Sequence, residues 1–163
     1  MPVEHVATLS TPIGVLSLRA QTGLLTQVTI GVGTAAILSE EAVDCPVLAE
    51  ARIQFAEYFA ARRTTFELPL KMPDWPPFSL RVLEALCAIP FGEVRSYGEV
   101  ARLAGSPGAA RAVGQVMAAN PLPIILPCHR VIAAGGLPGG YSGGGGLATK
   151  GWLLDFERRH AGR

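Results

Sequence analysis

One cysteine in this chain stands directly beside two residues that can change its reactivity. Cys128 is followed by His129 and Arg130, and three prolines lie in the segment that runs from Asn120 to it. The thiolate is the nucleophilic form of cysteine, and a neighbouring base or positive charge lowers the pKa of the thiol. Prolines restrict the backbone, so the segment should hold the sulfur in a fixed position. The pattern predicts that Cys128 is an activated nucleophile.

The other two cysteines, Cys45 and Cys87, have no such neighbours. Neither forms a CxxC pair, and we expect both to be buried as small hydrophobic residues. His5 and Cys45 lack the spacing of metal ligands, so we expect no metal and no cofactor. An odd number of widely spaced cysteines is typical of a reducing compartment, and the N-terminus has no basic-then-apolar leader. These features predict a cytoplasmic protein.

The two halves of the chain carry opposite net charge. Residues 1–94 contain 6 Lys+Arg and 10 Asp+Glu, a net charge of −4, whereas residues 95–163 contain 8 and 3, a net charge of +5. A basic region suits a polyanion such as DNA, although uneven charge also arises by chance in a small protein. No apolar run approaches the roughly 20 residues that span a bilayer, so we expect no membrane partner.

The first half predicts a small antiparallel sheet with one helix. Residues 5–10, 15–20 and 24–30 alternate apolar and polar side chains between turn signals, which is typical of adjacent strands. Apolar residues at helical spacing follow from 48 to 59. Three prolines in residues 71–77 mark a linker. We therefore expect an N-terminal α/β domain at 1–70, with a ribonuclease H-like fold, and a second domain at 78–163.

The second domain is predicted to be helical. Ser96 and Glu99 have the spacing of a capping box and should start one short helix. Another helix should begin at Ser106-Pro107 and end before Asn120-Pro121. Two short helices joined by a turn with glycine predict a helix-turn-helix. The fold class is therefore α+β.

The second of these helices has one face with little side-chain bulk. Residues at i, i+3, i+4 and i+7 share this face, and they are Arg111, Gly114, Gln115 and Ala118. A helix with its side chains is about 10–12 Å wide, whereas the minor groove of DNA is about 6 Å wide. A face of small residues favours insertion into that groove, and a close helix–helix contact is the alternative interpretation.

Several motifs in this order resemble those of the O6-alkylguanine-DNA alkyltransferases. They are Arg111-Ala112-Val113-Gly114, Asn120-Pro121 and Pro127-Cys128-His129-Arg130-Val131, and the resemblance covers about residues 78–157. It implies a monomeric DNA repair protein whose partner is double-stranded DNA that contains O6-alkylguanine. Such a protein flips the damaged base out of the duplex and transfers the alkyl group irreversibly to Cys128. Whether O4-alkylthymine is also a substrate is left open.

The resemblance also implies roles for individual residues. The catalytic set is Cys128 as acceptor, His129 as a base acting through a bridging water, Glu157 in the last helix, and Asn120 as a hinge. Tyr97, Arg111, Gly114, Gln115, Ala118 and Arg130 are expected to contact DNA. Tyr97 would rotate the 3′ phosphate of the target nucleotide, and Arg111 would fill the space that the base leaves. Met117, Val131, Tyr141 and Ser142 are expected to line the base pocket.

A glycine-rich segment follows the cysteine motif. Eight of the twelve residues from Gly135 to Gly146 are glycine, without the arrangement of a phosphate-binding loop. We interpret this segment as the lip of the base pocket. Residues 143–146 carry about two glycines more than the family pattern, which should make the unbound lip more flexible. The size of the preferred alkyl group is therefore not predicted.

Two other functions use the same residues. A damage sensor would bind the flipped base without reacting, but sensors of this kind replace the cysteine that this chain keeps. A cysteine hydrolase would use Cys128, His129 and Glu157 over many turnovers, whereas an alkyl acceptor reacts once per chain.

Overall fold

The computed structural model describes residues 2–31, 44–137, 139–141 and 143–162. The chain divides into two compact units, Met1–Met72 and Pro73–Arg163. Across these described ranges, every helix is too short or too polar to cross a bilayer.

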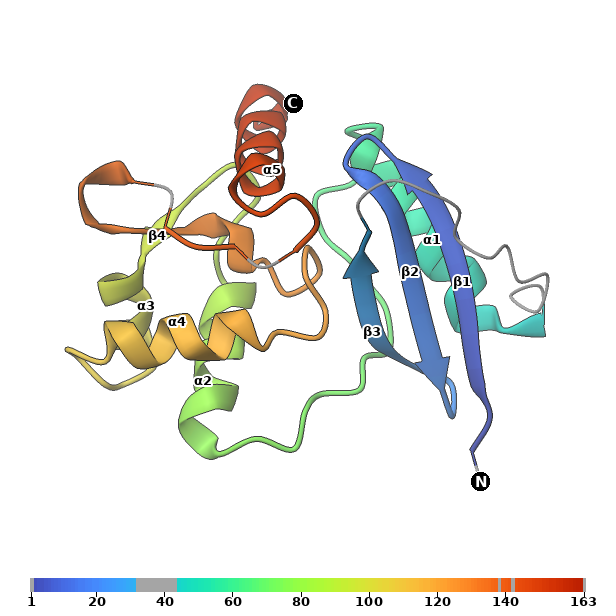
Figure 1. Cartoon of the computed structure of the whole chain (residues 1–163), viewed down its shortest axis with the longest axis horizontal. Coiled ribbons are helices and arrows are strands. Elements are labelled where there is room, and N and C mark those ends of the chain that lie inside the picture. Colours follow the sequence, from blue (N-terminus) through green and yellow to red (C-terminus); the bar gives the residue numbers. More distant parts are fainter. Residues whose placement is uncertain (1, 32–43, 138, 142, 163) are drawn as a thin grey trace. The chain divides into compact units, whose positions relative to one another are not determined.

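The first unit is a three-stranded antiparallel sheet with one helix against it (Figure 1). The strands β1 (Glu4–Thr11), β2 (Gly14–Gln21) and β3 (Leu24–Ile30) are neighbours in chain order, and α1 spans Pro46–Phe59. Every second residue of β2 from Leu16 to Ala20 is fully buried, because alternate side chains of a strand point to opposite faces. The predicted sheet and helix are confirmed.

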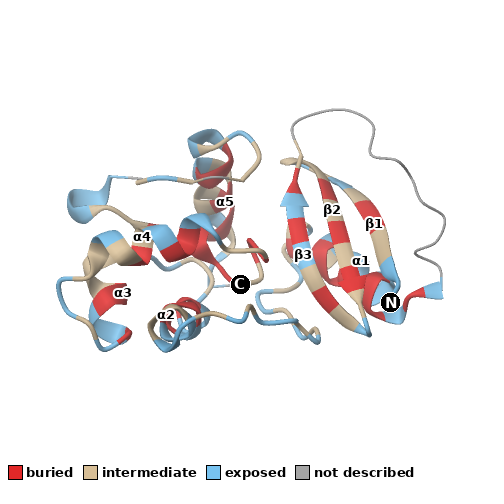
Figure 2. Ribbon diagram, turned by 60° about the horizontal axis from the view of Figure 1, so that its bottom comes forward, coloured by how far each residue is buried: buried red, intermediate tan, exposed pale blue. Residues whose placement is uncertain are grey.

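The second unit is mainly helical, as predicted. Its elements are α2 (Pro77–Cys87), β4 (Arg95–Ser96), α3 (Tyr97–Leu103), α4 (Ala110–Ala118), η2 (Cys128–Arg130), β5 (Val131–Ile132), η3 (Ala134–Gly136) and α5 (Leu147–His160). Helices α2, α3 and α4 contact one another and share a core to which each gives fully buried residues (Figure 2). Val82, Val100 and Val113 are examples.

The start of α3 is fixed by the predicted capping box. The Ser96 hydroxyl accepts a hydrogen bond from the Glu99 amide at 3.1 Å, and the Glu99 carboxylate accepts one from the Ser96 amide at 3.1 Å. The next helix begins at Ala110, later than expected, because Gly108 has a φ of 85° that is incompatible with a right-handed helix. The turn between α3 and α4 is therefore longer than the sequence indicated.

A short parallel pairing connects α3 to the cysteine segment. Arg95 pairs with Val131 and Ser96 with Ile132, so β5 lies beside β4. Because β5 directly follows η2 in the chain, the first residue of α3, Tyr97, is held close to the segment that carries Cys128.

The three cysteines are free thiols, and two of them are buried. Cys45 is buried as expected. The expectation that Cys87 is buried was wrong, because it is the last residue of α2 and lies on the exposed side of that helix.

Replacing Ser96 with alanine should lower the free energy of unfolding of the second unit by about 1 kcal/mol, since the first turn of α3 loses its cap. Both tryptophans, Trp75 and Trp152, belong to this unit, so urea denaturation followed by tryptophan fluorescence measures the effect. Ser106→Ala is the control and should change the value by less than about 0.5 kcal/mol. Equal effects of the two substitutions would contradict the capping role.

Candidate active site and DNA-facing surface

The segment between α4 and Cys128 is folded back on itself by Asn120. The Asn120 side-chain amide donates a hydrogen bond to the Leu126 carbonyl at 2.8 Å, and its oxygen accepts one from the Leu122 amide at 2.9 Å. One side chain thus closes the turn from both directions. This geometry agrees with the hinge expected at Asn120.

The backbone of this segment is held in an unusual conformation. Ile124 is buried and has a φ of 75°, in the left-handed region that β-branched residues rarely adopt. The Cys128 amide donates to the Leu126 carbonyl at 2.7 Å. Such strain persists only where the surrounding structure enforces it. The position of the sulfur is therefore fixed by packing and by Asn120 as well as by prolines.

The thiol of Cys128 is not a resting thiolate. Cys128 is 7% exposed, and burial raises the pKa of its thiol because a buried charge is poorly solvated. The Asn120 side chain and the Lys150 ammonium act in the opposite direction without reversing the shift. This differs from the expectation of a thiol whose pKa is lowered by its neighbours. Activation must come from a base that removes the proton.

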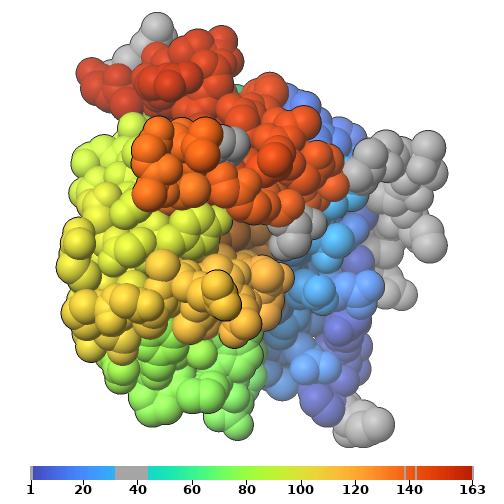
Figure 3. All heavy atoms as spheres, turned by 60° about the vertical axis from the view of Figure 1, so that its left-hand side comes forward, coloured from blue at the N-terminus to red at the C-terminus, as the bar shows by residue number. Residues whose placement is uncertain are grey.

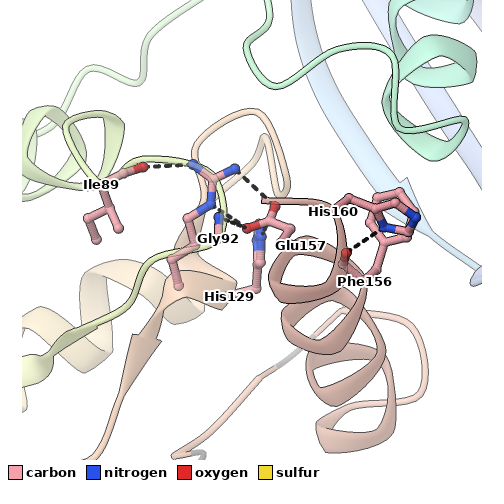
Figure 4. A network of polar contacts seen from close by, with 7 residues as sticks. Ile89, Gly92, His129, Phe156, Glu157 and His160 are labelled. Carbon is pink, nitrogen blue, oxygen red and sulfur yellow. Dashed lines mark hydrogen bonds and ion pairs between the residues drawn. The ribbon is translucent and has the colours of Figure 1, made fainter. Parts of the chain in front are cut away.

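The candidate base, His129, belongs to a buried network around Glu157 (Figure 4). His129 is fully buried, and its Nε2 lies 2.8 Å from Oε2 of Glu157, whose side chain is 1% exposed. The Gly92 amide approaches Oε1 at 3.4 Å. His129 and Glu157 were predicted to act together, and the structure brings them into direct contact across 28 positions of sequence.

The pKa values of His129 and Glu157 are both lowered, which leaves the histidine neutral and the glutamate charged. The pKa of His129 is lowered, chiefly by burial and also by the charges of Arg130 and Lys150, although Glu157 acts in the opposite direction. Burial would raise the pKa of Glu157, but the hydrogen bonds and charges of His129 and Arg130 outweigh it and hold that pKa well below its usual range. At neutral pH the pair is therefore a neutral imidazole and a carboxylate.

Arg130 does not face DNA, which corrects the prediction for this residue. It is 6% exposed, and its guanidinium donates to both oxygens of Glu157, from Nε to Oε1 at 2.8 Å and from Nη2 to Oε2 at 2.9 Å. The third contact runs from Nη1 to the Ile89 carbonyl at 2.7 Å. A buried arginine with these partners cannot reach a phosphate at the surface.

A cavity of about 540 Å³ opens above the Cys128 sulfur. It is lined by Tyr97, Ala110, Arg111, Gly114, Met117, Ala118, Cys128, Gly140 and Tyr141. Figure 3 shows the amber surface of α4 next to the orange surface of residues 131–137 and 139–141, and these segments give most of this lining. The structure thus brings the expected acceptor, pocket residues and small-residue face of α4 around one space. Its volume falls in the range of ordinary ligand pockets.

Two other predicted site residues, one from the base pocket and one from the DNA-contacting set, do not line this cavity. Val131 is fully buried beneath it, because its strand pairs with β4, so the expectation that it lines the pocket was wrong. Gln115 is exposed and borders a second hollow, which Trp75 and Phe78 also line. Ser142 lies outside the described residues.

The lip of the cavity is anchored by a lysine that sequence reasoning did not select. Lys150 is fully buried, and its ammonium donates to the Val131 carbonyl at 2.5 Å and to the Gly140 carbonyl at 3.1 Å. Lys150 and Glu157 are seven residues apart in α5 and so share one face. That spacing was visible in the sequence and could have indicated a buried role for the lysine.

Tyr97 holds the same lip from the other side. Its hydroxyl accepts a hydrogen bond from the Gly140 amide at 3.3 Å. A Cβ at Gly139 would lie 2.7 Å from that hydroxyl, and Gly139 has a φ of 71°, so only glycine fits there. The extra glycines form a turn in which the Gly145 amide donates to Thr149 Oγ1 at 2.8 Å.

The arrangement suits the transfer of a group from a bound ligand to sulfur. The neutral thiol of Cys128 lies at the cavity, and the buried His129 can act as a base because Glu157 stabilises its charged form. Among residues 2–31, 44–137, 139–141 and 143–162, no group of three or more His, Cys, Asp or Glu side chains could hold a metal ion.

Comparisons with known proteins agree on one family. Residues 77–159 match the family model described as "6-O-methylguanine DNA methyltransferase, DNA binding domain". The methylated-DNA–protein-cysteine methyltransferase of Mycolicibacterium paratuberculosis is 43% identical over 94% of this chain and 92% of its own length. The constitutive enzyme of that name from Bacillus subtilis is 39% identical over 96% of each chain. The solved structure of Mycobacterium tuberculosis OGT in complex with DNA has a TM-score of 0.82 and 40% identity, over 96% of this chain and 94% of that chain.

The stability of the second unit should fall as the pH drops below about 6.5. In that range the unfolded chain binds a proton at His129, whereas the folded protein does not, because folding lowers the pKa of His129. Below about pH 4.5 the unfolded chain also binds a proton at Glu157, whose pKa is likewise lowered in the folded protein. Each proton bound only by the unfolded chain favours unfolding. Urea denaturation between about pH 8 and pH 4, followed by tryptophan fluorescence, measures the change. His160→Gln, at a half-buried histidine outside the network, should keep this pH dependence. A free energy of unfolding that is constant from about pH 7 to pH 5 would contradict it.

Proposed function

The chain belongs to the 6-O-methylguanine DNA methyltransferase family, and from that membership we infer that it repairs alkylated DNA by taking the alkyl group onto its own Cys128. One observation supports this choice of residue above all. Cys128 lines the cavity, and the next residue in the chain, His129, is buried and hydrogen-bonded to Glu157. Cys45 lines a different hollow, which His5 and Glu50 also line, but among the described residues no hydrogen-bonded pair of a histidine and a carboxylate lies beside Cys45 or Cys87.

The reaction is a direct exchange of one bond for another. Cys128 Sγ attacks the alkyl carbon on guanine O6, a C–S bond forms, and the C–O6 bond breaks with its electron pair passing to guanine. The thiol proton passes through a bridging water to His129 Nδ1 and is returned to the departing guanine. Thiol and O6-alkylguanine thus become S-alkylcysteine and guanine. A thioether has no good leaving group, so each chain reacts once.

Access to O6 requires the base to leave the duplex, because the atom lies within the paired stack. The exposed Arg111 stands on α4 at the mouth of the cavity, where its side chain can fill the space that the base vacates. The neighbouring positions Gly114 and Ala118 carry almost no bulk, which lets α4 approach the minor groove closely. Tyr97 lines the same cavity, with its ring 3.8 Å from where a Cβ at Gly114 would lie, and we expect it to turn the target's phosphate.

Double-stranded DNA is thus the partner, and the protein acts on it as a monomer. We place the reaction in the cytoplasm, where the acceptor thiol stays reduced. The preserved cysteine distinguishes this function from an unreactive damage sensor, and a single turnover distinguishes it from a hydrolase.

Incubation with duplex DNA containing O6-methylguanine should place one methyl group on the peptide that contains Cys128, as measured by mass spectrometry. Cys128→Ser should abolish transfer, because a hydroxyl is far less nucleophilic than a thiol under the same base. Cys87→Ser, which removes an exposed thiol outside the cavity, is the matched control and should transfer normally. An unmodified Cys128 in folded protein, or more than one turnover per chain, would rule out the proposal.

Arg111→Ala should slow transfer from duplex DNA by about 10²-fold, since unstacking a base costs a few kcal/mol that the arginine no longer offsets. The free base O6-benzylguanine needs no extrusion, so its reaction with the same variant should keep its rate. Arg62→Ala, which removes one exposed charge from the first unit, should affect neither substrate. Equal losses with duplex and free base would contradict a role in extrusion.

A further inference from the structure

Arg130 is the most completely bound cation of the site. Two of its N–H groups bind the two oxygens of Glu157 side by side, at 2.8 and 2.9 Å, and a third binds the Ile89 carbonyl at 2.7 Å. Paired contacts of this kind fix both the position and the orientation of a carboxylate. The Phe91 ring lies 5.8 Å from the guanidinium carbon. The arginine is therefore locked in place, and it locks Glu157 with it.

The same carboxylate determines which nitrogen of His129 carries the proton. Oε2 of Glu157 accepts from Arg130 and faces Nε2 of His129 at 2.8 Å. A carboxylate held by an arginine is ionised and can only accept, so Nε2 must be the donor. A neutral imidazole has one N–H, which leaves Nδ1 with a lone pair. Nδ1 is buried and has no hydrogen-bond partner among the described residues.

Arg130 also decides whether His129 is neutral. The charged groups that face His129 are Glu157 and Lys150 from α5 and Arg130 from η2. A lone carboxylate beside a buried imidazole stabilises the imidazolium. Here burial lowers the pKa of His129, Glu157 opposes this, and the charges of Arg130 and Lys150 lower the pKa further. The arginine therefore opposes the attraction that would keep a second proton on the ring.

We propose that Arg130 is a positioning residue for alkyl transfer, because its grip on Glu157 keeps His129 as a neutral imidazole whose Nδ1 can accept the Cys128 proton. The inference rests on the proposed function, since it assigns a task within the same site. Without the arginine, the Glu157 carboxylate faces His129 uncompensated, and the equilibrium moves toward the imidazolium. An imidazolium cannot take a proton, and the buried thiol then stays protonated and unreactive.

The first measurement needs no DNA. The ring signals of His129 are followed by NMR as a function of pH in the wild-type chain and in Arg130→Met, with His5 and His160 assigned by substitution. The titration midpoint of His129 should rise by about 1 to 3 pH units in Arg130→Met, because a nearby positive charge is lost. Arg130→Lys keeps a charge but cannot bind both oxygens, so its midpoint should rise by less.

The second measurement is the pH dependence of the single-turnover transfer rate. The acidic limb of the profile should move to higher pH in Arg130→Met by the same amount as the His129 midpoint, and by less in Arg130→Lys. Arg158→Met is the matched control, since it removes an exposed arginine of α5 whose ion pair with Asp155 lies at the surface. It should leave both the midpoint and the rate profile unchanged.

An unchanged His129 midpoint together with an unchanged rate profile would overturn the proposal, even if the variant unfolds more readily. If Arg130→Met does not fold, Arg130→Lys decides: a raised midpoint supports the proposal, and an unchanged one overturns it. A wild-type chain that transfers no alkyl group would refute the proposed function alone, because the titration of His129 still tests the role of Arg130.

Discussion

The buried carboxylate of Glu157 is the constraint on which the rest of the site depends. An ion that leaves water must be compensated by partners in good geometry, and removing one partner of such a pair costs about 3–5 kcal/mol. Its partners come from two separate stretches of chain, the loop at Gly92 and the 3₁₀ turn with His129 and Arg130, whereas Glu157 itself belongs to α5. A shift of any of these would leave a charge unpaired, so the carboxylate fixes their mutual positions.

Helix α5, which holds Glu157, also positions residues at the cavity. Two turns before Glu157, the Lys150 ammonium holds the carbonyls of Val131 and Gly140. Val131 belongs to β5, the strand that follows the 3₁₀ turn of Cys128, and Gly140 belongs to the lip next to Tyr141. The floor and the lip of the cavity are therefore positioned by one face of α5. Tyr97 holds Gly140 from α3, which ties the lip to that helix as well.

The buried Cys128 thiol is neutral, so its reactivity requires a base that removes its proton. Burial raises the thiol pKa, so the resting protein exposes no thiolate to oxidants or to electrophiles in solution. In the proposed function, deprotonation depends instead on His129, and the proposed task of Arg130 is to keep that residue able to accept a proton. Reactivity is then confined to a ligand that fills the cavity, which suits a protein that can react only once.

The sequence by itself determined the features that depend on neighbouring residues. Ser96 and Glu99 cap α3 from three residues apart, alternating side chains make the first sheet, and Cys128 and His129 are adjacent in the chain. The family motifs identified Glu157 as well. Only the tertiary structure decided the direction of Arg130, the burial of Val131, the exposure of Cys87 and the use of Lys150. The reason is physical: capping and strand alternation are local, whereas the pairing of Arg130 with a carboxylate 27 residues away depends on how a 3₁₀ turn packs against α5.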